Sequence, residues 1–147
     1  MAIPFPSIGG GQRYFISEEA ETYSTIRDYT ELRVWHSGME LAEAIYKITA
    51  RFPPHEQFGL SSQLQRAIVS VPSNIAEGYS RNRSGDYLRF LSIARSSLSE
   101  VKTQLVIAGR LGYIERQEAT TVLIRVDELL RQLTALYSSI ERSPRRK

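Results

Sequence analysis

The sequence predicts an all-α protein, an antiparallel up-down four-helix bundle. Four long segments place apolar residues at alternating steps of three and four, and short connections marked by proline or glycine separate them. No segment has the pattern of a convincing strand. With 147 residues, the chain is long enough to bury the core of one domain and too short for two ordinary domains.

The first helix is expected over Val34 to Arg51. Its apolar residues alternate in steps of four and three, which is the pattern of a helix that buries one stripe in a bundle. Pro53 and Pro54 follow, and neither can continue the hydrogen-bond ladder of a helix. The helix therefore ends before this pair.

A second helix is expected to begin near Leu60 or Ser61, and its apolar pattern includes Pro72. A proline inside a helix costs about 3 kcal/mol, so this helix either ends near Val71 or kinks at Pro72. The apolar residues beyond the proline stay in helical register from Ile75 onward, which favours the kink.

The third helix has Ser84 as its expected N-cap and Asp86 in its first turn, where the helix dipole favours a negative charge. Gly112 is its expected stop, since glycine readily adopts the left-handed conformation that often follows a helix. The fourth helix begins between residues 115 and 117 and keeps the same apolar rhythm to Ile140.

Charge divides the chain into three parts. Residues 1–30 form an acidic leader that we expect to be flexible, residues 31–142 form the bundle, and residues 143–147 form a basic C-terminal tail. The chain has no cysteine, which excludes disulfides, thiolate zinc sites and cysteine nucleophiles. No apolar run approaches the roughly 20 residues that span a bilayer. We therefore expect a cytoplasmic protein without a membrane partner.

Residues that carry enzyme chemistry are scattered. His36 and His55 have no partner at metal-ligand spacing, and no serine lies in a GxSxG turn. Glu77, which is near Asn74 in sequence, is the best candidate for a functional acid, but an ion pair or a helix-end hydrogen bond explains it better than catalysis. The sequence therefore predicts a protein that is not an enzyme and holds neither a metal nor a cofactor.

Two surface features remain. Four arginines and two interleaved tyrosines surround the turn between the second and third helices, as phosphate contacts and stacking rings would require, and a solvated turn with core-facing tyrosines explains them equally well. These residues are Arg81, Arg83, Arg89, Arg95, Tyr79 and Tyr87. The third helix also has a polar face of small residues, which suits close packing against another subunit. This face contains Arg89, Ser92, Ser96, Ser99, Thr103 and Arg110.

Three stretches resemble the bacterial four helix bundle protein family, also called the ribosomal RNA intervening-sequence protein family. They read LRVWHSGMELAEAIYKIT, FPPHEQFGLSSQLQRAIVSVPSNIAEGYSR and YLRFLSIARSSLSEVKTQLVIAGRLGYI, within a similarity that runs from Leu32 to Leu136. The resemblance implies a left-handed antiparallel bundle that assembles into a ring-shaped homopentamer. Family members are often encoded within intervening sequences of large-subunit ribosomal RNA genes.

The family also resembles the accessory variability proteins of diversity-generating retroelements, basic pentamers that bind nucleic acid and a reverse transcriptase. By position, Asn74, Glu77 and Gly78 match the most recognisable sequence motif of the intervening-sequence protein family. Arg66, Arg89 and Arg95 match recurring basic positions of that family. The resemblance supplies no catalytic role for any of them. We therefore expect Asn74 and Glu77 to be structural.

The sequence predicts a homo-oligomer, a pentamer by the resemblance, that binds RNA or DNA phosphates. The predicted contact residues are Arg81, Arg83, Arg89, Arg95, Lys102, Arg110, Arg145, Arg146 and Lys147. The predicted structural or interface residues are Arg66, Asn74, Glu77, Ser92, Ser96 and Ser99. The alternative is a protein-interaction subunit, for instance of a retroelement reverse transcriptase.

Overall fold

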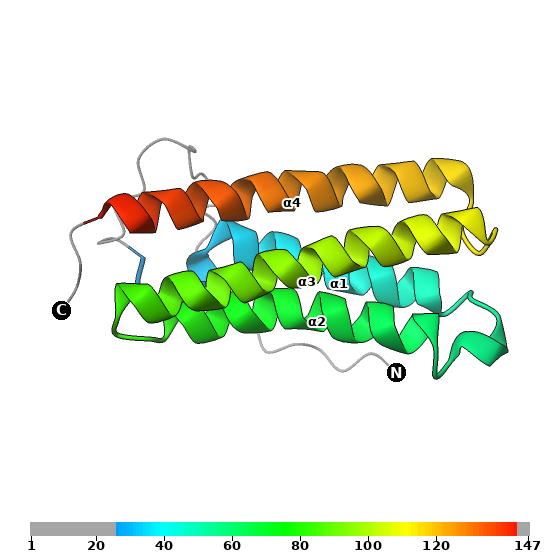
Figure 1. Ribbon diagram of the computed structural model, residues 1–147, viewed down its shortest axis with the longest axis horizontal. Helices are drawn as coiled ribbons and strands as arrows, with labels where there is room; N and C mark the ends of the chain where they lie inside the picture. The colour runs from blue at the N-terminus through cyan, green and yellow to red at the C-terminus, as the bar shows by residue number, and fades with distance from the viewer. Residues whose placement is uncertain (1–25, 144–147) are drawn as a thin grey trace.

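Four helices make up the bundle in the computed structural model, which describes residues 26–143 (Figure 1). They are α1 (Arg33–Thr49), α2 (Leu60–Tyr79), α3 (Ser84–Arg110) and α4 (Arg116–Arg142), with two short 3-10 helices, η1 (Tyr29–Glu31) and η2 (Pro54–Glu56). Each helix runs antiparallel to the one before it (Figure 1). Within residues 26–143 there is no strand, so the predicted all-α four-helix bundle is confirmed.

The core follows the apolar rhythm of the sequence. Each helix contributes one stripe of buried aliphatic side chains, and burying each of them stabilises the fold by about 1.5–3 kcal/mol. The best-buried members include Leu41 and Ile45 on α1, Leu64, Ile68 and Ile75 on α2, Leu91, Leu98 and Leu105 on α3, and Leu129 and Leu133 on α4. Among the pairs of neighbouring α-helices, α2 and α3 share the most extensive contact, and α1 and α4 share the least extensive one.

Pro72 lies inside α2, which continues from Leu60 to Tyr79 without ending near Val71. The proline ring is buried against Gly38 of α1, where an added Cβ would lie 3.4 Å from Cβ of Pro72. The small residue on α1 therefore leaves room for the proline ring, and packing against α1 offsets part of the cost of the missing N–H donor.

The predicted cap of α3 is off by one residue. α3 begins at Ser84, and Arg83 in the extended conformation occupies the N-cap without a side-chain hydrogen bond. Asp86 lies in the first turn, as predicted. At the other end, Gly112 has φ of +76° and Tyr113 N–H donates to the Ala108 carbonyl at 2.9 Å, so the glycine stops the helix as predicted.

The segment before α1 packs on the bundle. Ile26 and Tyr29 lie against the core, and Tyr79 Oη donates to the Ile26 carbonyl at 2.6 Å. His36 Nε2 lies 2.5 Å from the Thr30 carbonyl. Contact with the bundle thus begins by Ile26, before residue 31, where the sequence analysis placed the boundary between leader and bundle. Residues 1–25 of the predicted leader and residues 144–147 of the predicted tail lie outside the described residues.

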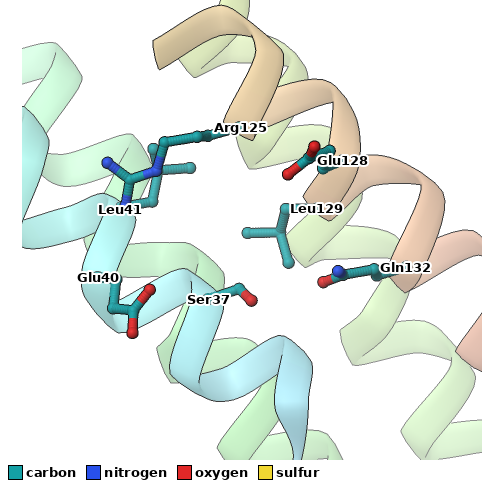
Figure 2. Close-up of a pocket in the computed structure, with 7 residues that line it drawn as sticks. All are labelled: Ser37, Glu40, Leu41, Arg125, Glu128, Leu129 and Gln132. Atoms are coloured by element: carbon teal, nitrogen blue, oxygen red, sulfur yellow. The ribbon is translucent and has the colours of Figure 1, made fainter. Parts of the chain in front are cut away.

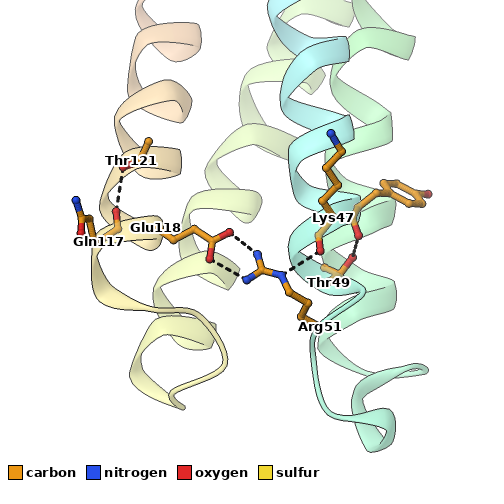
Figure 3. A network of polar contacts seen from close by, with 7 residues as sticks. Lys47, Thr49, Arg51, Gln117, Glu118 and Thr121 are labelled. Carbon is orange, nitrogen blue, oxygen red and sulfur yellow. Dashed lines mark hydrogen bonds and ion pairs between the residues drawn. The ribbon is translucent and has the colours of Figure 1, made fainter.

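Polar contacts close the opposite end of the bundle (Figure 3). Arg51, just after α1, makes a two-pronged ion pair with Glu118 at the start of α4, with one N–O distance of 3.1 Å. This carboxylate raises the pKa of the Arg51 guanidinium. Glu56 accepts a hydrogen bond from the Leu60 N–H at 2.6 Å and so satisfies the first N–H of α2, whose N-cap is Gly59.

Candidate nucleic-acid interface

Positive charge concentrates on one half of the bundle. The hairpin of α2, its turn and α3 (residues 60–111) carries seven basic and three acidic side chains, a net charge of +4. Residues 33–59 carry three of each sign, and residues 112–143 carry four basic against five acidic side chains. The α2–α3 hairpin is therefore the part of the described bundle with the largest positive charge.

Arg81, Arg83 and Arg89 lie at or near the α2–α3 turn, and we call this set the turn arginines. Arg81 pairs with Glu77 at 2.5 Å, and both side chains are about half exposed (49% and 51%). A solvated pair at this spacing contributes roughly 0.3–0.5 kcal/mol, so a phosphate can displace it at little cost. Within residues 26–143, no carboxylate forms an ion pair with Arg83 or Arg89, and both are exposed.

Phe90 is the aromatic residue among the turn arginines. The guanidinium carbon of Arg81 lies 5.1 Å from the centre of the Phe90 ring, and that of Arg89 lies 6.0 Å from it. These contacts hold two cations near one half-buried ring. The signal for Phe90 in the sequence is that it is apolar and yet falls outside the apolar rhythm of α3.

The tyrosines do not serve as stacking rings. Tyr87 is fully buried, and Tyr79 is half-buried with its hydroxyl bonded to Ile26. The sequence left two explanations open for these rings, stacking on nucleic acid or packing in the core. The structure shows that they pack toward the core. Gly78 leaves room for the buried Tyr87 ring and for Phe90, since a Cβ there would lie 2.8 Å from both Phe90 Cβ and Tyr87 Cδ2. The glycine allows α2 and α3 to approach closely.

The other predicted contact residues do not join this cluster. Arg95 lies over the Tyr137 ring of α4 at 5.4 Å, and Lys102 pairs with Asp127 of α4 at 2.7 Å. Arg110 ends α3, roughly 30 Å from Arg89 at 1.5 Å per residue. Arg145, Arg146 and Lys147 lie outside the described residues.

The small polar face of α3 is exposed. Its hydroxyls bond partly to their own helix: Ser99 donates to the Arg95 carbonyl at 3.2 Å and Thr103 to the Ser99 carbonyl at 3.0 Å. An open groove of about 330 Å³ runs beside this face between α3 and α4. The groove is lined by Ser92, Arg95, Ser96, Ser99, Leu130 and Thr134.

Asn74 bonds to Ser70 on its own helix, and Ser70 links α2 to α3. Its Nδ2 donates to the Ser70 carbonyl at 2.7 Å and to Ser70 Oγ at 2.8 Å. Ser70 Oγ in turn lies 2.9 Å from Ser97 Oγ on α3. Ser70 thus bonds across the helix pair as well as to its own helix. Arg66, one turn earlier on α2, is exposed.

The α1–α4 seam holds a small polar pocket of about 100 Å³ (Figure 2). Side chains from both helices line it, namely Ser37, Glu40, Leu41, Arg125, Glu128, Leu129 and Gln132. Small-molecule sites usually enclose about 300 Å³ or more, so this pocket is small for a substrate. Among the described residues, no group of three or more His, Cys, Asp or Glu side chains could hold a metal ion.

None of the described helices is long and apolar enough to cross a membrane.

Comparisons with known proteins show the family and the fold to which this bundle is similar. The family model of the 23S rRNA-intervening sequence protein matches residues 30–135. A crystal structure of a protein of unknown function from the S23 ribosomal protein family of Bacteroides thetaiotaomicron is similar in fold, with a TM-score of 0.65 and 24% sequence identity over 71% of this chain and 97% of that one. A search of curated proteins gives no significant match. The chain belongs to the 23S rRNA-intervening sequence protein family.

Proposed function

We propose that this protein is a non-enzymatic, oligomeric nucleic-acid-binding protein that contacts RNA or DNA phosphates through the turn arginines. One observation carries the proposal: the α2–α3 hairpin has a net charge of +4, and Arg83 and Arg89 are exposed there without an ion-pair partner in residues 26–143. A cytoplasmic location, expected from the sequence, is part of the proposal.

The chemistry of the site favours phosphates over bases. A guanidinium presents a fork of donors that matches a phosphate, and it releases condensed counterions when it binds. Neither tyrosine offers a free ring for stacking on a base, because Tyr87 is buried and the hydroxyl of half-buried Tyr79 is bonded to Ile26. Arg81 and Arg89 already lie over the Phe90 ring. Binding should therefore depend weakly on sequence and strongly on salt.

The proposal is tested by titrating structured RNA and duplex DNA across ionic strengths with two matched double variants. Arg83→Ala/Arg89→Ala removes two exposed arginines from the hairpin, and Arg116→Ala/Arg131→Ala removes two exposed arginines from α4. Each lost phosphate contact lowers the slope of log affinity against log salt by about 1. We expect a slope about 2 smaller for the hairpin variant and little change for the α4 variant. Equal effects, or no binding at low salt, contradict the proposal.

The oligomer in this proposal is a homopentamer, as the family resemblance implies. The exposed hydroxyl face of α3 and the groove beside it are suited to close contact with a second copy. Light scattering is the test, since five chains of 16.7 kDa give about 84 kDa. A single chain at micromolar concentration contradicts this part of the proposal and leaves the phosphate contacts untouched.

The groove between α3 and α4 favours a second candidate function, an accessory subunit that binds a protein such as a retroelement reverse transcriptase. Ser96→Arg would fill the groove and add positive charge. If the groove binds a protein, this substitution abolishes that complex and leaves nucleic-acid affinity equal or higher. A reverse transcriptase gene beside this one favours the second candidate, whereas a position inside a ribosomal RNA gene favours a role linked to the ribosome.

A further inference from the structure

The turn arginines have an acidic segment of the same chain tethered next to them. We propose that Glu18, Glu19 and Glu21 dock on these arginines and compete with nucleic acid for them. This inference rests on the proposed function for its consequence, while the docking itself can be measured without any nucleic acid.

The tether is fixed at a known point. Tyr79 is the last residue of α2, and its hydroxyl donates to the Ile26 carbonyl at 2.6 Å. Arg81 follows Tyr79 by two residues and Arg83 by four. Figure 1 shows the start of the described chain at the same end of the bundle as the α2–α3 turn. The described chain therefore begins at the end of the bundle that holds the turn arginines.

The acidic residues are within reach from this point. Glu21 precedes Ile26 by five residues and Glu18 by eight, so an extended chain carries them up to about 18 Å and about 28 Å from the anchor. Arg81 and Arg83 lie at most about 7 Å and about 14 Å from Tyr79 along the chain by the same measure. The carboxylates can meet the guanidiniums without any movement of the bundle.

The turn arginines favour an acidic segment over an apolar one, because its charge is opposite to theirs. Three carboxylates fall within four consecutive residues, and Arg13 is the sole basic residue among the first 25. The nearer acids of the anchored segment are engaged with backbone, because Asp28 accepts from Thr30 N–H at 2.8 Å and Glu31 from Arg27 N–H at 3.3 Å. A short tether gives the acidic segment an effective concentration on the order of millimolar, which a nucleic acid must outcompete.

The absence of native cysteine makes the docking measurable by cross-linking. In the full chain, Ala20→Cys places one thiol within the acidic segment and Asn82→Cys places another between Arg81 and Arg83. We expect the intramolecular disulfide to form several-fold more slowly when Glu18, Glu19 and Glu21 are all changed to Gln, and also at high salt. A segment that is tethered but not docked forms the disulfide at the same rate in both backgrounds, and that result overturns the proposal.

The competition is tested by RNA affinity at low salt with a charge-matched control. Glu18→Gln/Glu19→Gln/Glu21→Gln removes three negative charges from the segment, and Glu40→Gln/Glu43→Gln/Glu128→Gln removes three exposed ones from α1 and α4. Both variants have the same net charge. We expect about a tenfold gain in affinity for the first and less than twofold for the second.

The two readouts separate the docking from the proposed function. Equal gains in both variants mean a general charge effect and overturn the competition. If the disulfide rates change as expected and neither variant binds RNA or DNA, the docking stands and the proposed function fails. Disulfide rates that do not respond to the Gln changes or to salt overturn the docking whatever the RNA measurements show.

Discussion

The α2–α3 hairpin and the α1–α4 seam have similar apolar interiors and different exteriors. The hairpin is closely packed, with Gly78 against Tyr87 and Phe90, and carries a net charge of +4. The α1–α4 seam is held at one end by Arg51 and Glu118 and encloses a polar pocket of about 100 Å³. The same repeating core thus supports one surface with a strong charge bias and one without it. We propose the first as the surface that binds nucleic acid.

The largest expected difference between the two regions comes from core truncation. Leu98 is fully buried on α3, whereas Leu129, also buried, lines the α1–α4 pocket. Leu98→Ala should lower the free energy of unfolding by about 3–5 kcal/mol and Leu129→Ala by about 2–3 kcal/mol, because the new space beside Leu129 opens into a polar pocket that water can enter. Denaturant unfolding measures both. A larger loss for Leu129→Ala contradicts the difference in packing.

Glycine substitutions test the close approach of α2 and α3 more narrowly. Gly78→Ala should lower the free energy of unfolding by about 1–3 kcal/mol, because the added Cβ would lie 2.8 Å from Phe90 and Tyr87. Gly109→Ala meets only Ala119, at 3.8 Å, and should raise stability by about 0.5–1 kcal/mol through a stiffer unfolded chain. Thermal melts of the two variants should shift in opposite directions, and a melting temperature that does not fall in Gly78→Ala would show that the hairpin is looser than described.

Smaller effects are expected from the polar links of each region. Asn74→Ala removes two hydrogen bonds at Ser70 and should cost about 1 kcal/mol. Arg51→Ala breaks an ion pair that water surrounds and should change the melting temperature less than Asn74→Ala does. A greater loss at Arg51 would mean that the α1–α4 seam depends on this pair more than on its core.

Much of the fold was predictable because all four helices of the bundle repeat the same spacing of apolar residues. The steps of three and four marked the buried stripe of every helix, and Tyr87 belongs to the stripe of α3, so its burial followed from the same pattern. The predicted N-cap of α3 is one residue too late. Serine is a preferred N-cap residue, which favoured Ser84, but the backbone is extended at Arg83 and helical from Ser84 onward. The packing of Pro72 on Gly38 depends on helix rotation, which one sequence does not specify.

The candidate site was predictable only in part. The sequence located the arginines, but it did not show which of them have partners on other helices. Lys102 pairs with Asp127, which is 25 residues away, and Arg95 covers Tyr137 of α4. Such pairings depend on how α3 and α4 face each other. The exposed Arg83 and Arg89 emerged from the tertiary structure rather than from spacing.

Protection of arginines from a guanidinium reagent, with and without bound RNA, tests the central claim most directly. Phenylglyoxal modification followed by mass spectrometry reports each exposed arginine separately. Bound RNA should protect Arg83 and Arg89 on the hairpin and leave Arg116 and Arg131 on α4 as reactive as before. Protection confined to α4, or equal protection of all four arginines, would contradict the assignment of nucleic-acid binding to the α2–α3 hairpin.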